Sequence, residues 1–150
     1  MSSTSLRYIP ADPDFVPTAE DRDRAVARAL ERFPRAREVE LRVTPRVQLV
    51  DCGESFEQVR CPACGEDLEI DSWQDGMSAA FDGDGFGDLA WTTPCCGAET
   101  SLNALDYSWP MGFARACLEI ADPSEEPPGE LQRELEALLR CELRLIEARL

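Results

Sequence analysis

Apolar and polar residues follow two different periods in the first fifty residues of the chain. The apolar residues that recur at the spacing of one helix face are Val26, Ala29, Leu30 and Phe33. Thr18 precedes this stretch as a candidate N-cap, Asp21 stands at the third helical position, and Pro34 ends the pattern. The stretch 39–50 then alternates, with Val39, Leu41 and Val43 on one side. A helix followed by one long strand or two short ones is predicted.

The end of the chain repeats this order of patterns. Both copies contain Ala-Asp-Pro, a second proline four residues later and then a helical pattern, and an alternating stretch follows each helix. The matching segments are 9–30 with 119–140, and "VELRV" (39–43) with "CELRL" (141–145). One helix from about 129 to 150 is the alternative for the C-terminus. The repeat favours a helix to about Leu139 followed by a strand.

These patterns predict a β-α-β unit at each end of the chain, the second beginning with the strand "GFARACLEIAD". Two such units that close into one sheet, with both helices on one face, form a ferredoxin-like α+β sandwich. We therefore predict a single domain, 1–150, in which the halves 5–50 and 111–150 form the sandwich. Residues 51–108 would be an inserted module.

The predicted insert contains a short motif, "CPACG" (61–65), that is typical of a metal-binding turn. A C-x-x-C pair followed by glycine makes a tight turn in which both sulfurs point at one place. Val59 before the turn, and Leu68 and Ile70 after it, alternate as they would on a hairpin arm. The sequence therefore predicts a hairpin with a metal-binding knuckle at its tip.

A second motif, "TPCCG" (93–97), has the same form with one difference. When the two motifs are aligned on their glycines, Thr93 falls where Cys61 stands, and Cys95 falls where the first motif has alanine. The second knuckle has therefore lost a ligand, moved it by two positions, or carries a chance pair of thiols. Adjacent cysteines can both reach one ion when they lie in a turn, so a displaced ligand is favoured.

Three interpretations of the cysteines remain open. In the favoured one, a structural Zn²⁺ ion is bound by four thiolates, those of Cys61, Cys64, Cys95 and Cys96. In the second, Cys52 replaces Cys95. In the third there is no metal, and the cysteines are core thiols or a redox pair. Cys117 and Cys141 have apolar neighbours and are interpreted as packing residues.

Two further stretches of the insert have the pattern of a structural element or of a site. "DSWQDGMSAAF" predicts a short helix capped by Asp71 or Ser72. Its inward side would carry Trp73, Met77, Ala80 and Phe81. "FDGDGFGDLAW" has the spacing of a calcium loop in part, but Thr93 stands where the bidentate glutamate belongs. We therefore interpret it as a loop.

The charge of the chain narrows the classes of function. Its 150 residues carry a net charge of −15, every basic residue is arginine, and there is no histidine. Histidine-dependent triads and histidine-ligated zinc are excluded. The acidic balance disfavours nucleic acid and anionic lipid as partners. It is typical of a soluble, self-repelling surface, and the alternative is a surface that meets a basic partner or mimics nucleic acid. The absence of a long apolar run and of a signal-like start predicts a cytoplasmic protein without membrane association.

Two resemblances accompany these patterns. The paired knuckles resemble a zinc ribbon over about residues 56–104. The whole chain resembles uncharacterised small acidic zinc-ribbon proteins of actinobacterial type, through "RYIPADPDFVPTAEDRDRA", "CPACG", "TPCCGAETSLNALDYSWP" and "GFARACLEI". The resemblance implies a recurring fold and supplies no catalytic residues.

Three functions are consistent with these observations. The first is a non-enzymatic, zinc-stabilised adaptor that binds a protein partner, for example as an immunity or antitoxin-like inhibitor of a basic toxin. The second is a nucleic-acid-associated zinc-ribbon protein. The third is a metal-dependent enzyme or sensor with an open zinc position, as would arise if only Cys61, Cys64 and Cys96 bind the metal.

Overall fold

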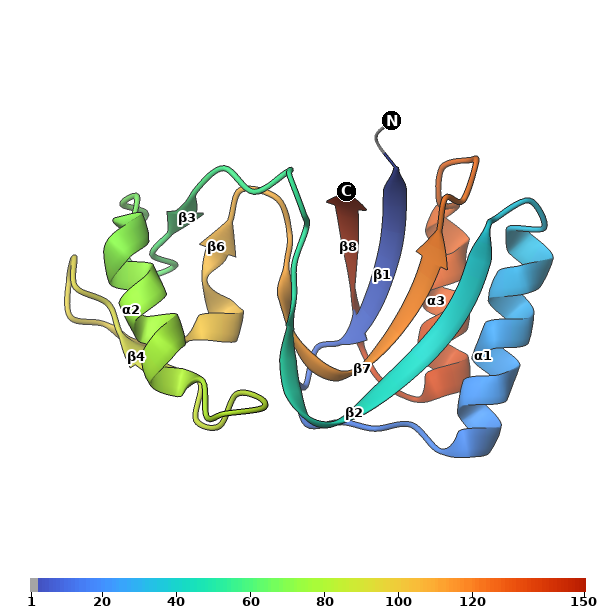
Figure 1. Cartoon of the computed structure of the whole chain (residues 1–150), viewed down its shortest axis with the longest axis horizontal. Helices are drawn as coiled ribbons and strands as arrows, with labels where there is room; N and C mark the ends of the chain where they lie inside the picture. The colour runs from blue at the N-terminus through green and yellow to red at the C-terminus, as the bar shows by residue number, and fades with distance from the viewer. Residues whose placement is uncertain (1–2) are drawn as a thin grey trace.

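A four-stranded antiparallel sheet joins the two ends of the chain in the computed structural model, which describes residues 3–150 (Figure 1). Its strands are β1 (Thr4–Pro10), β2 (Glu38–Val50), β7 (Gly112–Ala121) and β8 (Leu143–Arg149). The order across the sheet is β2-β7-β1-β8, and all neighbours are antiparallel. The predicted α+β class is confirmed.

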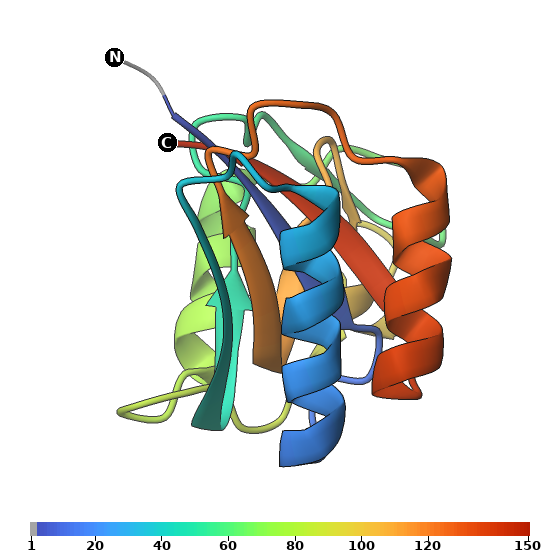
Figure 2. The ribbon, with the colours of Figure 1, turned by 90° about the vertical axis from the view of Figure 1, so that its right-hand side faces the viewer.

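Each half of the fold consists of a strand, a helix and a second strand. In the sheet, the two strands of each half are separated by one strand of the other half. Helix α1 (Ala19–Arg32) joins β1 to β2, and α3 (Gly129–Leu139) joins β7 to β8. Figure 2 shows both helices on the same face of the sheet. The chain leaves α3 at Arg140, whose φ of 64° is left-handed, and then forms a strand. The helix-then-strand prediction for the C-terminus is confirmed, and a single helix to residue 150 is excluded.

The core between the sheet and these two helices is built from alternating strand positions and one stripe of each helix. Its buried members are Leu6, Tyr8, Ala25, Ala29, Phe33, Leu118, Ile120, Leu131, Leu135, Leu139 and Leu143. Each large side chain buried here contributes about 1.5–3 kcal/mol to stability. The Thr18 cap is confirmed, because its hydroxyl accepts the Asp21 N–H at 3.1 Å. The prediction that Leu30 shares a face with Ala29 and Phe33 is wrong, since those two are buried and half of the Leu30 surface is exposed (50%).

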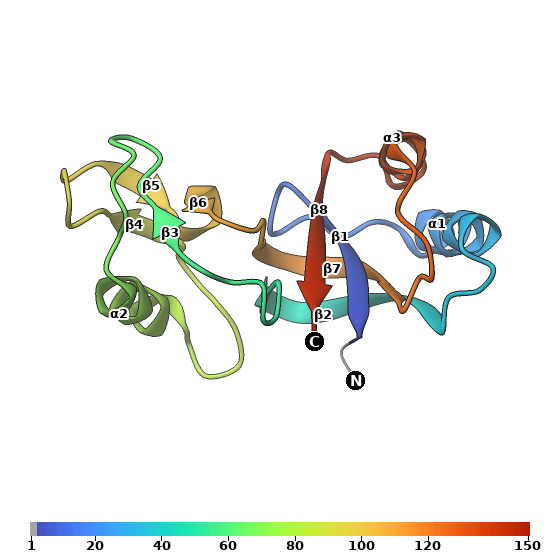
Figure 3. The same cartoon turned by 90° about the horizontal axis from the view of Figure 1, so that it is seen from above.

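The middle of the chain forms a second layer on the opposite side of the sheet from α1 and α3 (Figures 1 and 3). Its elements are β3 (Val59–Arg60), α2 (Ile70–Ala80), β4 (Ala90–Thr92), β5 (Glu99–Ser101), a 3-10 turn η1 (Leu102–Ala104) and β6 (Asp106–Tyr107). The strands form two small ladders, β3 with β6 and β4 with β5. Within residues 3–150, no helix combines the length and the apolar character that a membrane crossing requires.

Three sequence predictions about this middle layer are corrected. The hairpin arm after the first knuckle ends at Leu68, whose N–H donates to the Val59 carbonyl at 2.8 Å, and Ile70 already belongs to α2. The N-cap of α2 is Glu69, with no side-chain cap bond, rather than Asp71 or Ser72. Phe81 lies at the surface, 46% exposed. The helix itself is present, with Trp73 buried as predicted.

A second hydrophobic core ties the middle layer to the sheet. Its buried members include Ile9, Phe113 and Ile146 from the sheet, and Trp73, Phe86, Leu102 and Tyr107 from the middle layer. The Phe86 and Phe113 rings meet edge to face with centroids 5.0 Å apart. The Trp73 indole N–H donates to the Tyr107 hydroxyl at 3.3 Å, and that hydroxyl donates to the Leu102 carbonyl at 2.7 Å. The middle layer is therefore anchored by packing as well as by its own turns.

The sheet face opposite α1 and α3 carries an ion-pair network centred on Glu119 of β7. Its carboxylate accepts hydrogen bonds from Ser5 Oγ at 2.6 Å, Arg7 Nε at 2.9 Å and Arg42 at 2.7 Å. Burial by itself raises the pKa of this carboxyl group, but the bonds from Ser5 and Arg7 and the charge of Arg42 outweigh it, so the pKa is lowered. The network therefore favours the ionised form.

We expect the contribution of Glu119 to stability to disappear in acid. Because the folded pKa lies below the unfolded value of about 4.3, the stabilisation is complete above the unfolded pKa and is lost as the pH falls through the folded pKa. Wild type and Glu119→Gln should differ in unfolding free energy by about 2 kcal/mol near neutral pH, and the difference should shrink as the pH falls through the folded pKa of Glu119. Urea unfolding of both proteins across pH measures this difference. A difference that stays constant with pH would contradict the assignment.

Candidate metal centre

Two turns of the middle layer bring four cysteines to one point. Cys61 and Cys64 lie in the turn after β3, and Cys95 and Cys96 lie in the turn between β4 and β5. Each contributes a sulfur, and all four Sγ atoms lie within 4.8 Å of one another. The four thiols of the favoured sequence interpretation are therefore close enough to hold one metal ion.

The two turns have the same backbone hydrogen bonds. In each, the first residue donates to the carbonyl five positions on and accepts from the N–H four positions on, with N···O distances of 2.9 Å. The bonded pairs are Cys61 with Glu66 and Gly65, and Thr93 with Ala98 and Gly97. The glycine has a left-handed φ in both turns, +77° at Gly65 and +72° at Gly97. A side chain at either position would be strained there.

Thr93 occupies in the second turn the place that Cys61 occupies in the first. Both residues are 1% exposed. The Thr93 hydroxyl lies 3.7 Å from Cys61 Sγ and 3.5 Å from Cys96 Sγ, and it accepts the Ala98 N–H at 3.2 Å. A hydroxyl at these distances can donate to a thiolate but is not itself one of the four sulfurs. Thr93 therefore lies within hydrogen-bond reach of two of the thiols, and Cys95 supplies the fourth thiol of the cluster.

The spacing of the sulfurs suits tetrahedral coordination. Cys61 and Cys96 sulfurs are 3.8 Å apart, and Cys64 and Cys95 sulfurs are 3.4 Å apart. A zinc–sulfur bond of about 2.3 Å in a regular tetrahedron separates the sulfurs by about 3.8 Å. Four soft sulfur donors suit zinc or another thiophilic metal, and not the hard ions calcium or magnesium. The residues present therefore fit a closed thiolate site.

The thiols of the first turn have opposite pKa shifts. The N–H groups of Cys64 and Ala63, with the hydroxyl of Thr93, lower the pKa of Cys61 to about 6 against the effect of burial. The Glu66 N–H lowers the pKa of Cys64, but the Cys95 sulfur, partial desolvation and the other two sulfurs raise it to about 12. One thiolate thus forms readily, whereas repulsion between neighbouring thiolates opposes the ionisation of the other thiols. A bound cation would reduce this repulsion.

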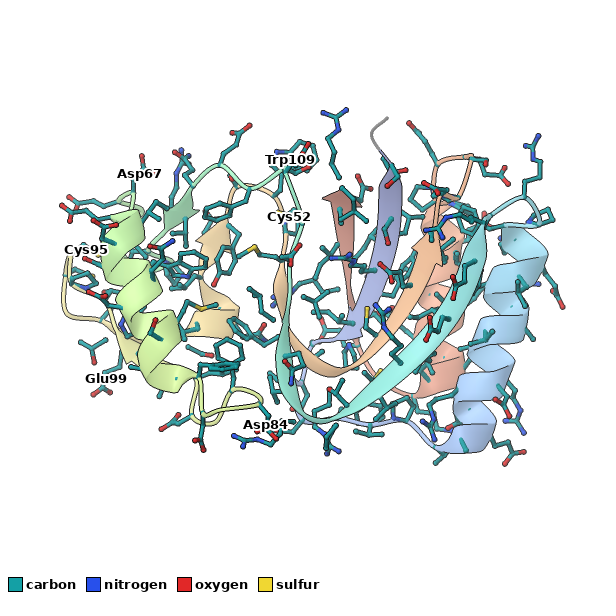
Figure 4. The ribbon with its side chains drawn as sticks, viewed as in Figure 1. Cys52, Asp67, Asp84, Cys95, Glu99 and Trp109 are labelled. Atoms are coloured by element: carbon teal, nitrogen blue, oxygen red, sulfur yellow. The ribbon has the colours of Figure 1, made fainter. Side chains whose placement is uncertain are left out.

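The remaining cysteines lie away from this cluster. Cys52 is fully buried beside the sheet, with its Sγ 4.0 Å from the Met111 sulfur, and Figure 4 shows it far from Cys95. The alternative in which Cys52 replaces Cys95 is therefore not supported by the geometry. Burial raises the pKa of Cys117 to about 12 and that of Cys141 to about 11, in keeping with packing thiols. All seven cysteines are free.

The exposure of the cluster was not anticipated from the sequence. Cys61 is buried, Cys95 is half-buried, and Cys64 and Cys96 are exposed. The centre therefore lies at the outer tip of the middle layer, where Figure 4 shows Cys95 at the end farthest from the sheet. No residue pattern gives this depth, because it depends on how the two turns stand relative to α2 and the sheet.

The equivalence of Thr93 and Cys61 predicts that the fourth ligand can be moved. Cys95→Ala should lower bound zinc well below one equivalent, because only three thiolates remain. Thr93→Cys added to Cys95→Ala should restore full binding, since it rebuilds a C-x-x-C turn like the first. Zinc content after dialysis, measured by atomic absorption, checks this. Restoration by Thr93→Ser instead of Thr93→Cys would refute the ligand exchange.

Comparison of the chain with protein-family models, curated proteins and solved structures gives no significant match. The resemblance to actinobacterial zinc-ribbon proteins therefore stays a prediction, and the function must be argued from the geometry.

Proposed function

We propose that the protein is a non-enzymatic, zinc-stabilised adaptor of ferredoxin-like fold that binds a basic protein partner. In this proposal residues 1–150 form one domain. Residues 51–108 are a zinc-ribbon module inserted between the halves 5–50 and 111–150. The strand order β2-β7-β1-β8 and the two matched turns support this organisation.

The proposed role of the zinc is structural. Four thiolates fill a tetrahedral ion completely, which leaves no position for water or substrate. The metal would join the turn at Cys61–Gly65 to the turn at Thr93–Gly97, which otherwise share no β-ladder. Ladders of two or three residue pairs are only marginally stable by themselves. Metal–thiolate bonds that join the two turns would therefore stabilise them strongly against unfolding.

The observation that carries the binding function is the unbalanced charge of the surface. Carboxylates exceed arginines by 30 to 15. Many arginines are already paired within the fold, such as Arg28 and Arg32 with Glu134 across the two helices, and Arg46 with Asp84. The surplus carboxylates face solvent, where they attract a basic surface and repel nucleic acid. An immunity or antitoxin-like inhibitor of a basic toxin is one concrete form.

One observation favours nucleic-acid association as a second function. Arg7, Arg42 and Arg115 line a hollow of about 240 Å³ on the open face of the sheet. However, Arg7 and Arg42 are both held by Glu119, and Arg7 also contacts Asp51. Their charge is largely neutralised in place, so a phosphate backbone would have to displace carboxylates. This arrangement makes the protein-binding function the better supported.

Affinity capture from native lysate tests the proposal. The immobilised protein should retain a basic protein at low ionic strength and release it as salt is raised, since the attraction is screened. A Cys61→Ser column should retain less if the partner contacts the module. Duplex and single-stranded DNA titrations at low salt serve as the comparison. Retention of nucleic acid with no bound protein would reverse the choice between the two functions.

A further inference from the structure

A groove crosses the end of the sheet where the chain termini lie. It has a volume of about 530 Å³. Its floor is the start of β1 and the end of β8, and one wall is the loop 123–127. Ser55 and Trp109, on the segments that lead into and out of the middle layer, line the other side. Figure 4 shows Trp109 between the middle layer and the sheet. We call this the Trp109 groove.

The Trp109 groove presents an aromatic face beside unpaired carboxylates. Trp109 is 42% exposed, although large apolar side chains are mostly buried in this fold. Glu125, Glu126 and Glu147 line the groove, and none of them has an arginine within ion-pair distance among residues 3–150. Arg149 is the one cation that the lining residues contribute, so they carry an excess of negative charge.

Hydrogen bonds hold the residues that adjoin both walls. Beside the loop 123–127, the Arg37 guanidinium donates to Asp122 at 2.8 Å. On the other side, Ser108 next to Trp109 accepts the Gln58 N–H with its hydroxyl at 3.0 Å and donates its own N–H to the Gln58 carbonyl at 3.0 Å. Anchoring the chain beside each wall lowers the conformational entropy that filling the groove would cost.

We propose that the Trp109 groove binds an extended arginine- or lysine-rich segment of a partner protein. One cationic side chain stacks on the Trp109 indole, and its neighbours pair with Glu125, Glu126 and Glu147. The inference rests on the proposed protein-binding function and gives it a location. Charge complementarity identifies the occupant, because a second copy of this chain carries the same charge of −15 and would be repelled.

The test uses a fluorescein-labelled peptide in which arginine alternates with glycine, and measures anisotropy against the zinc-loaded protein. Glu125→Gln with Glu126→Gln should weaken binding about tenfold, and Trp109→Ala about fivefold. Glu69→Gln with Glu99→Gln is the matched control, because it changes net charge equally at exposed carboxylates outside the groove. The control should retain the affinity of the wild type to within about twofold.

The outcomes separate this inference from the proposed function. Equal weakening by both pairs of substitutions would mean that the peptide is attracted by the overall charge. That result would contradict binding in the groove but would not contradict the adaptor function. Spermine binding at the groove as tightly as the peptide, with competition, would make the occupant a polyamine and overturn the proposal. If the wild type fails to bind the peptide while lysate capture still yields a basic protein, the groove proposal is wrong and the adaptor function is retained.

Discussion

Replacing Cys61 by serine should abolish stoichiometric zinc binding and open both turns of the metal centre. Cys61 is the buried thiol of the cluster and lies 3.8 Å from Cys96 in the other turn. Structural zinc sites provide on the order of 10 kcal/mol of binding free energy. Loss of about half of that would lower Tm by about 10–20 °C in a chain of this size.

Amide hydrogen exchange locates the effect of Cys61→Ser. The N–H groups of Gly65, Thr93 and Gly97, which close the two turns, should lose protection, whereas those of β1 and β7 should keep most of theirs. Cys141→Ser, a thiol outside the cluster, is the control and should retain full zinc. Full zinc content in Cys61→Ser or Cys95→Ser, together with its loss in Cys52→Ser, would show that the ligand assignment is wrong.

Phe113→Ala should destabilise the protein by about 3–5 kcal/mol. Phe113 is fully buried at the start of β7, and its ring packs against Phe86 of the middle layer with centroids 5.0 Å apart. The substitution leaves a cavity in the core that the sheet and the middle layer share. Phe81→Ala is a matched control, because Phe81 also packs on Phe86, at 5.3 Å, but is exposed. It should cost less than about 1 kcal/mol.

Urea unfolding of Phe113→Ala also tests the coupling between the two layers. All three tryptophans, Trp73, Trp91 and Trp109, lie in the middle of the chain, so their fluorescence reports on that part. Far-UV circular dichroism is dominated by α1, α3 and the sheet. Coincident transitions in the wild type that separate in Phe113→Ala would show that the shared core makes folding cooperative. A loss below about 1 kcal/mol in Phe113→Ala would contradict the packing argument.

The fold was predictable where the pattern is local, and less so where distant segments meet. The Thr18 cap and the helix that follows it depend on adjacent residues, and both are present. The pattern grouped Leu30 with Ala29 and Phe33 on one helix face, but the buried stripe runs through Ala25, Ala29 and Phe33 and leaves Leu30 exposed. Asp21 lies on the same stripe and is buried, with its carboxylate 3.3 Å from the Arg140 guanidinium beyond α3. A contact between residues so distant in sequence has no signal in either segment.

The candidate site shows the same limit. Two glycine-ended turns that share one cysteine position, Cys64 with Cys96, and carry a second cysteine each were sufficient to predict the cluster at Cys61, Cys64, Cys95 and Cys96. The choice between Cys95 and Cys52 required the position of Cys52 against Met111, which is a tertiary fact. Ile70 was assigned to a strand because alternation over two residues cannot be distinguished from the start of a helix. The supporting role of Thr93 became evident only from its distances to two sulfurs.

The central position of β1 also bears on how the chain folds during synthesis. Both partners of β1 are made more than a hundred residues later, since Ser5 pairs with Ala121 on one side and with Ala148 on the other. During synthesis this first strand stays unpaired until β7 and β8 have left the ribosome, which is nearly the end of the chain. The two cysteine turns emerge earlier and can already close around a metal ion. Sheet completion is then a late step governed by long-range contacts, which are slow to form and leave strand edges open to aggregation. A zinc-loaded nascent segment would shorten the loop that this late step has to close.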